Sequence, residues 1–261
     1  MADESAMERS EVSAAKDTVL RNLDDHLLGH TALRQQIKTD RSTDMSTTTP
    51  KRSLRNGSTG GPPRTDDRPA GNYGIDPSWG QERHRLALIE KFYDPMTIAQ
   101  LTELGVAAGW RCLEIGTGGG SIARWLRDRV GPEGRVVAID LDTRWFAAEP
   151  GIEARRADIM SDEIERDAFD LVHCRLLLHH LRGKQVEAVQ RMASTLRPGG
   201  IFIASECYLG AMRASCTRAF AELWRGLYAA LPNADYEWPV SLPATLQAAG
   251  LEAVDAGETS A

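Results

Sequence analysis

Four glycines, Gly116, Gly118, Gly119 and Gly120, stand almost side by side in the stretch RCLEIGTGGGSIARWL of residues 111–126. Clustered glycines lower local stability, so something must approach this backbone too closely for side chains. The cluster follows an apolar run and precedes a helical pattern, which indicates a ligand-approach loop between a strand and a helix. A tight turn that binds no ligand is the alternative.

The spacing of this loop limits the ligand that it can hold. A dinucleotide-binding loop reads G-x-G-x-x-G, and here Ser121 stands at the position of the third glycine. The pattern present is instead Glu114-x-Gly116-x-Gly118-x-Gly120. A carboxylate at a strand end is poorly placed for a pyrophosphate, and it suits a ligand that offers an ammonium group or other hydrogen-bond donors.

Alternating strand and helix patterns must position the loop. Strands are predicted at RCLEIG, GRVVAIDLD, IEARRAD, FDLVHCR and IFIASECYL, with helices at SIARWLRDRVG and KQVEAVQRMASTLRPGG and two more helices on either side of Asp94 and Pro95. This order implies right-handed βαβ units and therefore a doubly wound, mostly parallel α/β sheet. Ligands of such sheets bind beyond the carboxyl ends of the strands, where the glycine loop lies.

The glycine pattern resembles motif I of the class I S-adenosylmethionine-dependent methyltransferases. The likeness extends over residues 79–259 and includes VVAIDLD, RADI, FDLVHCRLLLHHL and LRPGG in the family's order. It implies a Rossmann-like methyltransferase fold, a small-molecule branch of the family, and S-adenosylmethionine as cofactor. The cofactor-binding residues implied are Glu114, Gly116, Thr117, Gly118, Gly120, Asp140, Leu141, Asp158, Ile159, Cys174 and Arg175.

The resemblance also implies separate roles for several of these residues. Asp140 would accept both ribose hydroxyls, Leu141 would lie against the adenine ring, and Asp158 would accept from the adenine amino group. The alternatives are that Asp140 and Asp158 only cap the turns that follow them, and that Glu114 orients the loop. Asp142 is predicted to be such a capping residue.

His179 and His180 are the candidate catalytic bases, because they follow the fourth strand near the expected position of the methyl group. A histidine can take a proton from a hydroxyl or an amine near neutral pH. Both histidines could instead only shape the pocket, and His173 is expected to be structural. Arg175 could hold the methionine carboxylate or an acidic acceptor.

The acceptor is expected to be a small molecule that presents a nucleophilic O, N or C atom. Its pocket would use the first helix of the domain, with Trp79, Glu82, Arg83 and Arg85, and an apolar stripe after the fifth strand. That stripe could be core or a lid, and its residues are Phe220, Trp224, Leu227, Tyr228 and Leu231. An NAD-dependent oxidoreductase and a catalytically degenerate cofactor-binding protein are the alternatives.

Composition changes sharply along the chain. Residues 1–35 are predicted to be an amphipathic helical extension, residues 36–74 a disordered linker rich in Ser, Thr, Pro and Gly, and residues 75–261 the methyltransferase domain. The extension could dock on the domain or dimerise, but it is expected to pack loosely. Deleting residues 1–72 is therefore expected to leave folding and cofactor binding nearly intact.

The C-terminus departs from the family pattern. The segment LEAVDAGETSA at residues 251–261 provides one strand, and no residues remain for the family's antiparallel seventh strand. We therefore expect the outer edge of the fifth strand to be patched by residues 252–259 or to be unpaired. An unpaired edge would invite pairing with another chain, such as a homodimer. The alternative is that the N-terminal region covers the gap.

Charge and cysteine content exclude other classes of protein. The chain of 261 residues has a net charge of −6, which argues against nucleic acid as a partner. No apolar run reaches the length of a membrane span, and the N-terminus has no signal-peptide pattern, so a cytoplasmic protein with no membrane partner is expected. The four cysteines lack the spacing of a metal site, and Cys112 and Cys174 are predicted to be buried thiols.

Overall fold

The computed structural model describes residues 31–38, 81–146, 149–208, 217–222, 226 and 234–259. Its strands are β1 (Thr31–Lys38), β2 (Arg111–Ile115), β3 (Arg135–Asp140), β4 (Ile152–Arg156), β5 (Phe169–Arg175), β6 (Leu196–Tyr208) and β7 (Glu252–Thr259). Its helices are α2 (Glu82–Glu103), α3 (Ser121–Val130), α4 (Gln185–Ala193) and α7 (Leu242–Ala248), with 3-10 turns η1 (Thr143–Trp145), η2 (Leu178–His180) and η3 (Trp238–Ser241). The five strands predicted from the sequence within residues 111–208 are all present.

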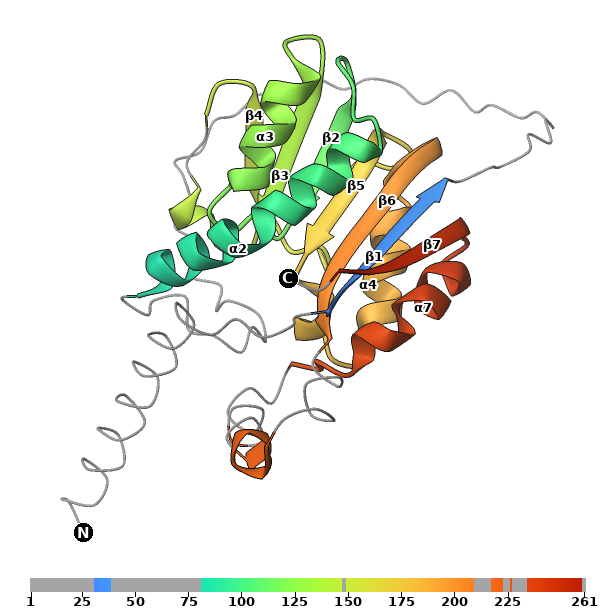
Figure 1. Cartoon of the computed structure of the whole chain (residues 1–261). Helices are drawn as coiled ribbons and strands as arrows, with labels where there is room; N and C mark the ends of the chain where they lie inside the picture. The colour runs from blue at the N-terminus through green and yellow to red at the C-terminus, as the bar shows by residue number, and fades with distance from the viewer. Residues whose placement is uncertain are drawn as a thin grey trace.

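All seven strands form one sheet in the order β4-β3-β2-β5-β6-β1-β7 (Figure 1). The pairs from β4 to β6 are parallel, as expected for a chain that returns through helices. Counted from β2 as the first strand, this half of the sheet has the order 3-2-1-4-5. The structure thus confirms the predicted doubly wound α/β fold.

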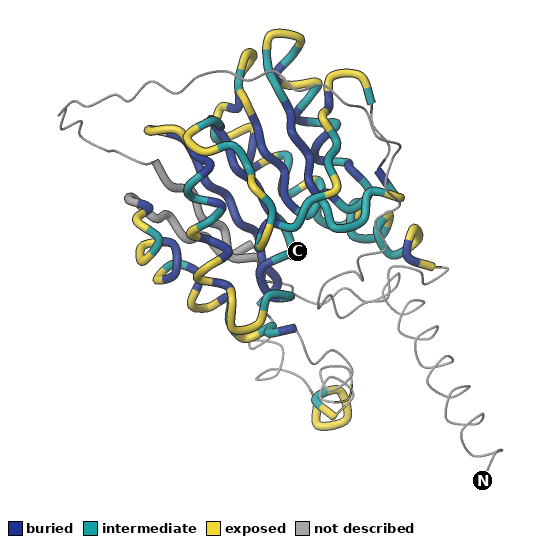
Figure 2. The backbone as a smooth tube through the Cα atoms, turned by 180° about the vertical axis from the view of Figure 1, so that it is seen from behind, coloured by how far each residue is buried: buried dark blue, intermediate teal, exposed yellow. Residues whose placement is uncertain are grey.

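Helices cover both faces of the sheet and divide the core in two. On one face, side chains of α2 and α3 such as Leu101 and Leu126 pack with strand residues such as Leu171. On the other face, side chains of α4 and α7, Met192 and Leu246 among them, belong to a cluster with strand residues such as Val172. The strands β2, β3 and β5 and the second half of β6 are accordingly buried almost without interruption (Figure 2). Buried strands leave only their ends and the adjoining loops for chemistry.

The helix α2 differs from the prediction of two helices. It continues through Pro95, although proline lacks the N–H that an interior helical residue donates. Residues on both sides of Pro95 are fixed to β5, because Asp94 forms an ion pair with Arg175 (2.9 Å) and the Thr97 hydroxyl accepts a hydrogen bond from it (3.0 Å). These contacts offset the missing backbone hydrogen bond and hold one helix across the sheet.

The position expected to be empty at the sheet edge is filled by β1. This strand lies antiparallel between β6 and β7, with Thr31 opposite Tyr208 and Ala32 opposite Thr259. The expectation that the edge of the fifth strand, β6, is unpaired or patched by residues 252–259 is therefore wrong, and the alternative that the N-terminal region covers the gap is right. Residues 31–38, assigned above to the helical extension and the linker, form this strand. The other residues of those two segments lie outside the described part of the chain.

The turn predicted at LRPGG lies inside β6 rather than before it. Leu196 pairs with Phe169 and Ile201 pairs with Leu171, so the intervening residues form an irregularity in the ladder. Gly199, with φ of 76°, adopts the left-handed conformation that this excursion requires.

Among the described helices, none is both long enough and apolar enough to cross a membrane.

Candidate functional site

The glycine loop lies between β2 and α3 and is fixed by hydrogen bonds to β3. The N–H of Gly116 donates to the carbonyl of Ile139 (2.9 Å), and the N–H of Gly120 donates to the carbonyl of Thr117 (2.9 Å). Gly116, Gly118 and Gly120 have φ of 73°, 57° and 86°, which side chains rarely tolerate. The sequence therefore needs glycine here because of the backbone conformation as well as close neighbours.

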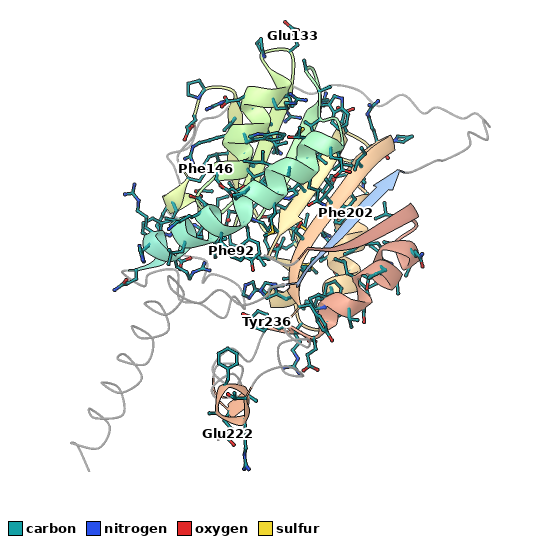
Figure 3. The ribbon with its side chains drawn as sticks, in the orientation of Figure 1. Phe92, Glu133, Phe146, Phe202, Glu222 and Tyr236 are labelled. Atoms are coloured by element: carbon teal, nitrogen blue, oxygen red, sulfur yellow. The ribbon has the colours of Figure 1, made fainter. Side chains whose placement is uncertain are left out.

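Those neighbours belong to the protein itself. A Cβ at Gly120 would lie 2.0 Å from a ring carbon of Phe146, which packs beside the start of α3 (Figure 3). A Cβ at Gly119 would lie 2.2 Å from Oε1 of Glu90 on α2. At Gly116 the nearest atom is Cδ1 of Leu177, at 3.3 Å. The loop is thus enclosed by β3, α2 and the segment after β5.

Asp140 ends β3 and uses both carboxylate oxygens to hold the loop. Oδ2 accepts from the N–H of Gly118 (2.8 Å) and Oδ1 accepts from the N–H of Asp142 (3.0 Å). Burial is the main reason that the pKa of Asp140 is raised above its ordinary value, and these N–H groups partly oppose the shift. Each oxygen keeps a second lone pair, so the carboxylate can still accept two hydroxyl donors.

The residues that follow Asp140 are turn residues. Asp142 caps η1 by accepting from the N–H of Arg144 (3.0 Å), as predicted. Leu141 is half-buried, and its carbonyl accepts from Arg156 (3.0 Å). These contacts fix the backbone of Leu141 directly after β3.

Glu114 is buried beside His173 on the neighbouring strand. Its Oε2 lies 2.6 Å from Nδ1 of His173, and the two residues are register partners on β2 and β5. Nε2 of His173 is also buried and makes no hydrogen bond within the described chain. This pairing favours the interpretation that Glu114 fixes the end of β2, from which the loop starts, and does not contact a ligand.

Asp158 and Ile159 lie in a turn after β4. Oδ1 of Asp158 accepts from the N–H of Met160 (2.8 Å), so this carboxylate does cap a turn. Ile159 is buried in the core, and its carbonyl accepts a short hydrogen bond from Arg191 on α4. Arg191 also binds the carbonyl of Asp162 (2.7 Å). Sequence reasoning missed this arginine, whose partner residues lie about thirty positions away along the chain.

Arg175 ends β5 beneath α2. Besides Asp94 and Thr97, its guanidinium lies 5.9 Å from the centre of the Tyr93 ring. Asp94 also accepts from the hydroxyl of Ser121 (3.0 Å), which begins α3. Arg175 therefore joins β5 to α2 and, through Asp94, to the loop helix. A cofactor carboxylate would have to share this guanidinium with Asp94.

Cys174 does not present its side chain to the site. The thiol is fully buried in the core under α4, and burial raises its pKa well above the ordinary value. At this position only backbone atoms of Cys174 could contact a cofactor, because the thiol lies in the core. Cys112, Cys174 and Cys207 are free, which confirms the prediction of buried thiols at the first two. Among the described residues, no three His, Cys, Asp or Glu side chains are grouped to hold a metal ion.

His179 is held by a buried carboxylate that the sequence analysis did not identify. Nδ1 of His179 lies 2.5 Å from Oε2 of Glu206 on β6, and both side chains are buried. Oε1 of Glu206 accepts from the N–H groups of Leu177 (3.0 Å) and Leu178 (2.7 Å). An acidic residue inside an otherwise apolar strand, in IFIASECYL, was the available signal.

The rings of His180 and Tyr236 both lie close to the ring of His179. The ring centres are 4.0 Å and 4.7 Å from that of His179, and Tyr236 lies beyond the lower end of the sheet in Figure 3. Burial, reinforced by His179 and Arg85, lowers the pKa of His180 to about 2. His180 is therefore neutral over the whole physiological range. The N–H of Asp235 donates to the carbonyl of His179 (2.7 Å), which fixes the Tyr236 segment here.

The segment that carries the two histidines reaches the glycine loop through Leu177. Leu177 contacts Gly116, and Leu86 of α2 lies 3.2 Å from the position of a Cβ at Gly118. Of the residues expected in the acceptor pocket, Glu82 is buried and paired with Arg85 (2.6 Å), whereas Arg83 and Phe220 are exposed. Trp79, Trp224, Leu227, Tyr228 and Leu231 lie outside the described residues.

The arrangement fits the cofactor implied by the resemblance. The loop offers a backbone without side chains, and Asp140 offers paired acceptors where the sheet ends. Oε1 of Glu90 is a buried carboxylate oxygen with no hydrogen-bond partner within the described chain, and it lies against the loop. A ligand with hydroxyl and ammonium donors would complete both carboxylates.

Comparisons with known proteins agree with this site. Residues 112–200 match the family model described as a methyltransferase domain. No curated protein matches the chain. The matched residues extend from β2 to the first residues of β6. They include the glycine loop, Asp140 and both histidines.

Several solved structures are similar over part of the chain. They include a complex between the Haloferax volcanii Trm112 methyltransferase activator and a methyltransferase (20% identity, 46% of this chain and 55% of that chain, TM-score 0.41). A SAM-dependent methyltransferase from Aquifex aeolicus matches at 17% identity, over 64% of this chain and 87% of that one, with a TM-score of 0.46. An S-adenosylmethionine-dependent methyltransferase from Mesorhizobium loti matches at 26% identity, over 44% and 54%, with a TM-score of 0.38.

The matches to the Haloferax and Mesorhizobium structures span only about half of those chains. The family model therefore carries the assignment, and it agrees with the sheet order and the glycine loop. Residues 112–200 of this chain are therefore similar to a methyltransferase domain.

Proposed function

We propose that the protein transfers a methyl group from S-adenosylmethionine to a nucleophilic O, N or C atom of a small-molecule acceptor, with His179 as the base. The observation that carries this proposal is the buried contact between Glu206 and His179. His179 is two residues along the chain from Leu177, which lies against Gly116. S-adenosylmethionine supplies a methyl group bound to a positively charged sulfur.

Asp140, the glycine loop and Leu141 are the residues that would hold the cofactor. Asp140 would bind the adjacent ribose hydroxyls with the spare lone pairs of its carboxylate. The loop would bring the cofactor against the backbone of residues 116–120. Asp158 and the backbone at Ile159 and Cys174 would complete the adenine side, and Arg175 would be shared with Asp94.

His179 would accept a proton from the acceptor at Nε2. A carboxylate can only accept hydrogen bonds, so Glu206 binds the N–H at Nδ1 and leaves Nε2 as the basic atom. The same carboxylate would stabilise the imidazolium that forms. His180 has too low a pKa for this task, so its proposed part is to shape the pocket beside His179.

The character of the surrounding residues supports a small acceptor. His179 is buried against the rings of His180 and Tyr236, so the proposed base does not lie on an open surface. The chain's net charge of −6 also disfavours nucleic acid. Ser121 and Glu114 disfavour an NAD-dependent oxidoreductase.

A panel of small metabolites, scored for release of S-adenosylhomocysteine, tests the proposal. We expect turnover with at least one hydroxyl, amine or carbon acid, and loss of that turnover in His179→Ala. Cofactor binding without turnover on a broad panel would favour the catalytically degenerate alternative. Turnover that is unchanged in His179→Ala would exclude His179 as the base.

A further inference from the structure

One carboxylate at the glycine loop, that of Glu90, takes no part in the function proposed above. Glu90 lies on α2, and its Oε1 is buried without a hydrogen-bond partner within the described chain. The neighbouring acids differ in this respect: Asp94 pairs with Arg175, Glu114 contacts His173, and Asp140 accepts two backbone N–H groups. A buried carboxylate oxygen without a donor lowers the stability of the protein, unless a ligand supplies that donor.

The position of Glu90 points toward the cofactor loop. Oε1 is the atom nearest to a Cβ built on Gly119, at 2.2 Å, and the Glu90 Cδ follows at 3.1 Å. Gly119 is the one glycine of the loop without a positive φ, so its backbone could accommodate a side chain. The space taken by Glu90 therefore explains why residue 119 is a glycine.

The chemistry of the cofactor selects the group that Glu90 would meet. S-adenosylmethionine carries two positive groups, and only the ammonium has N–H donors, because the sulfonium has none. The Gly119 carbonyl already accepts from Arg124 (2.8 Å), whereas Oε1 of Glu90 has no donor within the described chain. Building on the proposed function, we infer that Glu90 receives the ammonium group of the cofactor's amino-acid end and makes this site selective for ligands that carry it.

Three ligands separate this inference from other roles of Glu90. S-adenosylmethionine has both positive groups, S-adenosylhomocysteine keeps only the ammonium, and methylthioadenosine has neither. Their dissociation constants would be measured by calorimetry for the wild type, Glu90→Gln, Gly119→Ala and Glu103→Gln. Gly119→Ala displaces the Glu90 carboxylate without removing it, and Glu103 is an exposed acid on the same helix and serves as the control.

We expect Glu90→Gln and Gly119→Ala to raise the dissociation constants of S-adenosylmethionine and S-adenosylhomocysteine about 10- to 100-fold. This is the effect expected for loss of a charged hydrogen bond. The dissociation constant of methylthioadenosine should change by less than about twofold in these two variants. Glu103→Gln should leave all three dissociation constants unchanged. The melting temperature of ligand-free Glu90→Gln should equal or exceed that of the wild type, because a buried charge is removed.

Three results would overturn the inference. Weaker binding of S-adenosylmethionine alone would mean that Glu90 contacts the sulfonium. Equally weaker binding of all three ligands would mean that Glu90 only shapes the loop. Unchanged affinities in Glu90→Gln would mean that it has no role in binding. If the wild type binds none of the three ligands, the proposed function itself fails.

Discussion

Glu206 Oε2 lies 2.5 Å from Nδ1 of His179, although the two residues are 27 positions apart in the chain. Oε1 of the same side chain accepts from the backbone of Leu177 and Leu178. One buried carboxylate therefore fixes both the ring of His179 and the segment that contacts Gly116.

Replacing Glu206 with Gln should slow methyl transfer more than it weakens cofactor binding. The amide keeps the size of the side chain but loses the charge that orients His179 and stabilises its protonated form. We expect kcat with an acceptor from the panel to fall about 100-fold, within the range for general-base catalysis. The dissociation constant of S-adenosylhomocysteine should change by less than about threefold.

Glu187→Gln, an exposed acid on α4, is the control for this experiment. Circular dichroism would establish that both variants are folded before their rates are compared. Wild-type kcat in folded Glu206→Gln would contradict the role given to the carboxylate.

Asp140→Ala should make the binding free energy of S-adenosylmethionine less favourable by about 2–3 kcal/mol, because the substitution removes a charge-assisted contact with two hydroxyl groups. An unchanged dissociation constant would exclude the ribose assignment.

The pH dependence of binding tests the same residue. Burial raises the pKa of Asp140 above the ordinary 3.8, so the carboxyl becomes protonated at a higher pH than an exposed Asp. The protonated form has lost its charge and binds hydroxyl donors less well. Affinity should therefore be constant above this pKa and fall as the pH decreases through it. Calorimetry on Asp140→Asn, which should show weak binding and no such fall, is the control.

Disrupting β1 should destabilise the domain, contrary to the expectation from the sequence that residues 1–72 are dispensable. Gln35 lies opposite Ala204 on β6 and Ala256 on β7, so this strand has neighbours on both sides. Proline at position 35 cannot donate to the ladder and should lower the free energy of unfolding by about 3 kcal/mol. Deletion of residues 1–72 should have at least this effect.

Urea unfolding would measure both changes, with Thr48→Pro, outside β1, as the matched substitution. Equal stability of Gln35→Pro, Thr48→Pro and the wild type would show that β1 does not hold the sheet together.

Gly120→Ala should be far more disruptive than alanine at a glycine with the same backbone conformation. Its Cβ would lie 2.0 Å from the Phe146 ring, and its φ is 86°. Gly109 has a φ of 82° with no atom within 4 Å of a Cβ. We expect losses of about 3–4 kcal/mol at Gly120 and about 1 kcal/mol at Gly109 in urea unfolding. Equal losses would mean that Phe146 moves aside freely.

The parts of the fold that depend on local pattern were predictable. Apolar runs gave the strands from β2 to β6, and the glycines located the loop because turns with positive φ require them. Asp142 was predicted as a cap from its position after a strand. The edge strand β1 was not predictable in this way, because TALRQQIK shows little alternation of apolar and polar residues. Its strand conformation comes from pairing with β6 and β7.

The site was predictable only where it rests on sequence motifs. Asp140 and the histidines follow strands within recognisable patterns. Glu206, Glu90 and Arg191 act across the fold, and their partners are distant in sequence, so no spacing identifies them. Cys174 and Glu114 lie next to motif positions, but the alternation of a strand directs their side chains into the interior.

Parallel calorimetric titrations of the purified full chain with S-adenosylmethionine and with NAD test the central claim most directly. The account predicts saturable binding of S-adenosylmethionine at one site per chain, lost or strongly weakened in Asp140→Ala, and no measurable binding of NAD. Binding of NAD that Asp140→Ala abolishes, with no heat from S-adenosylmethionine, would contradict it.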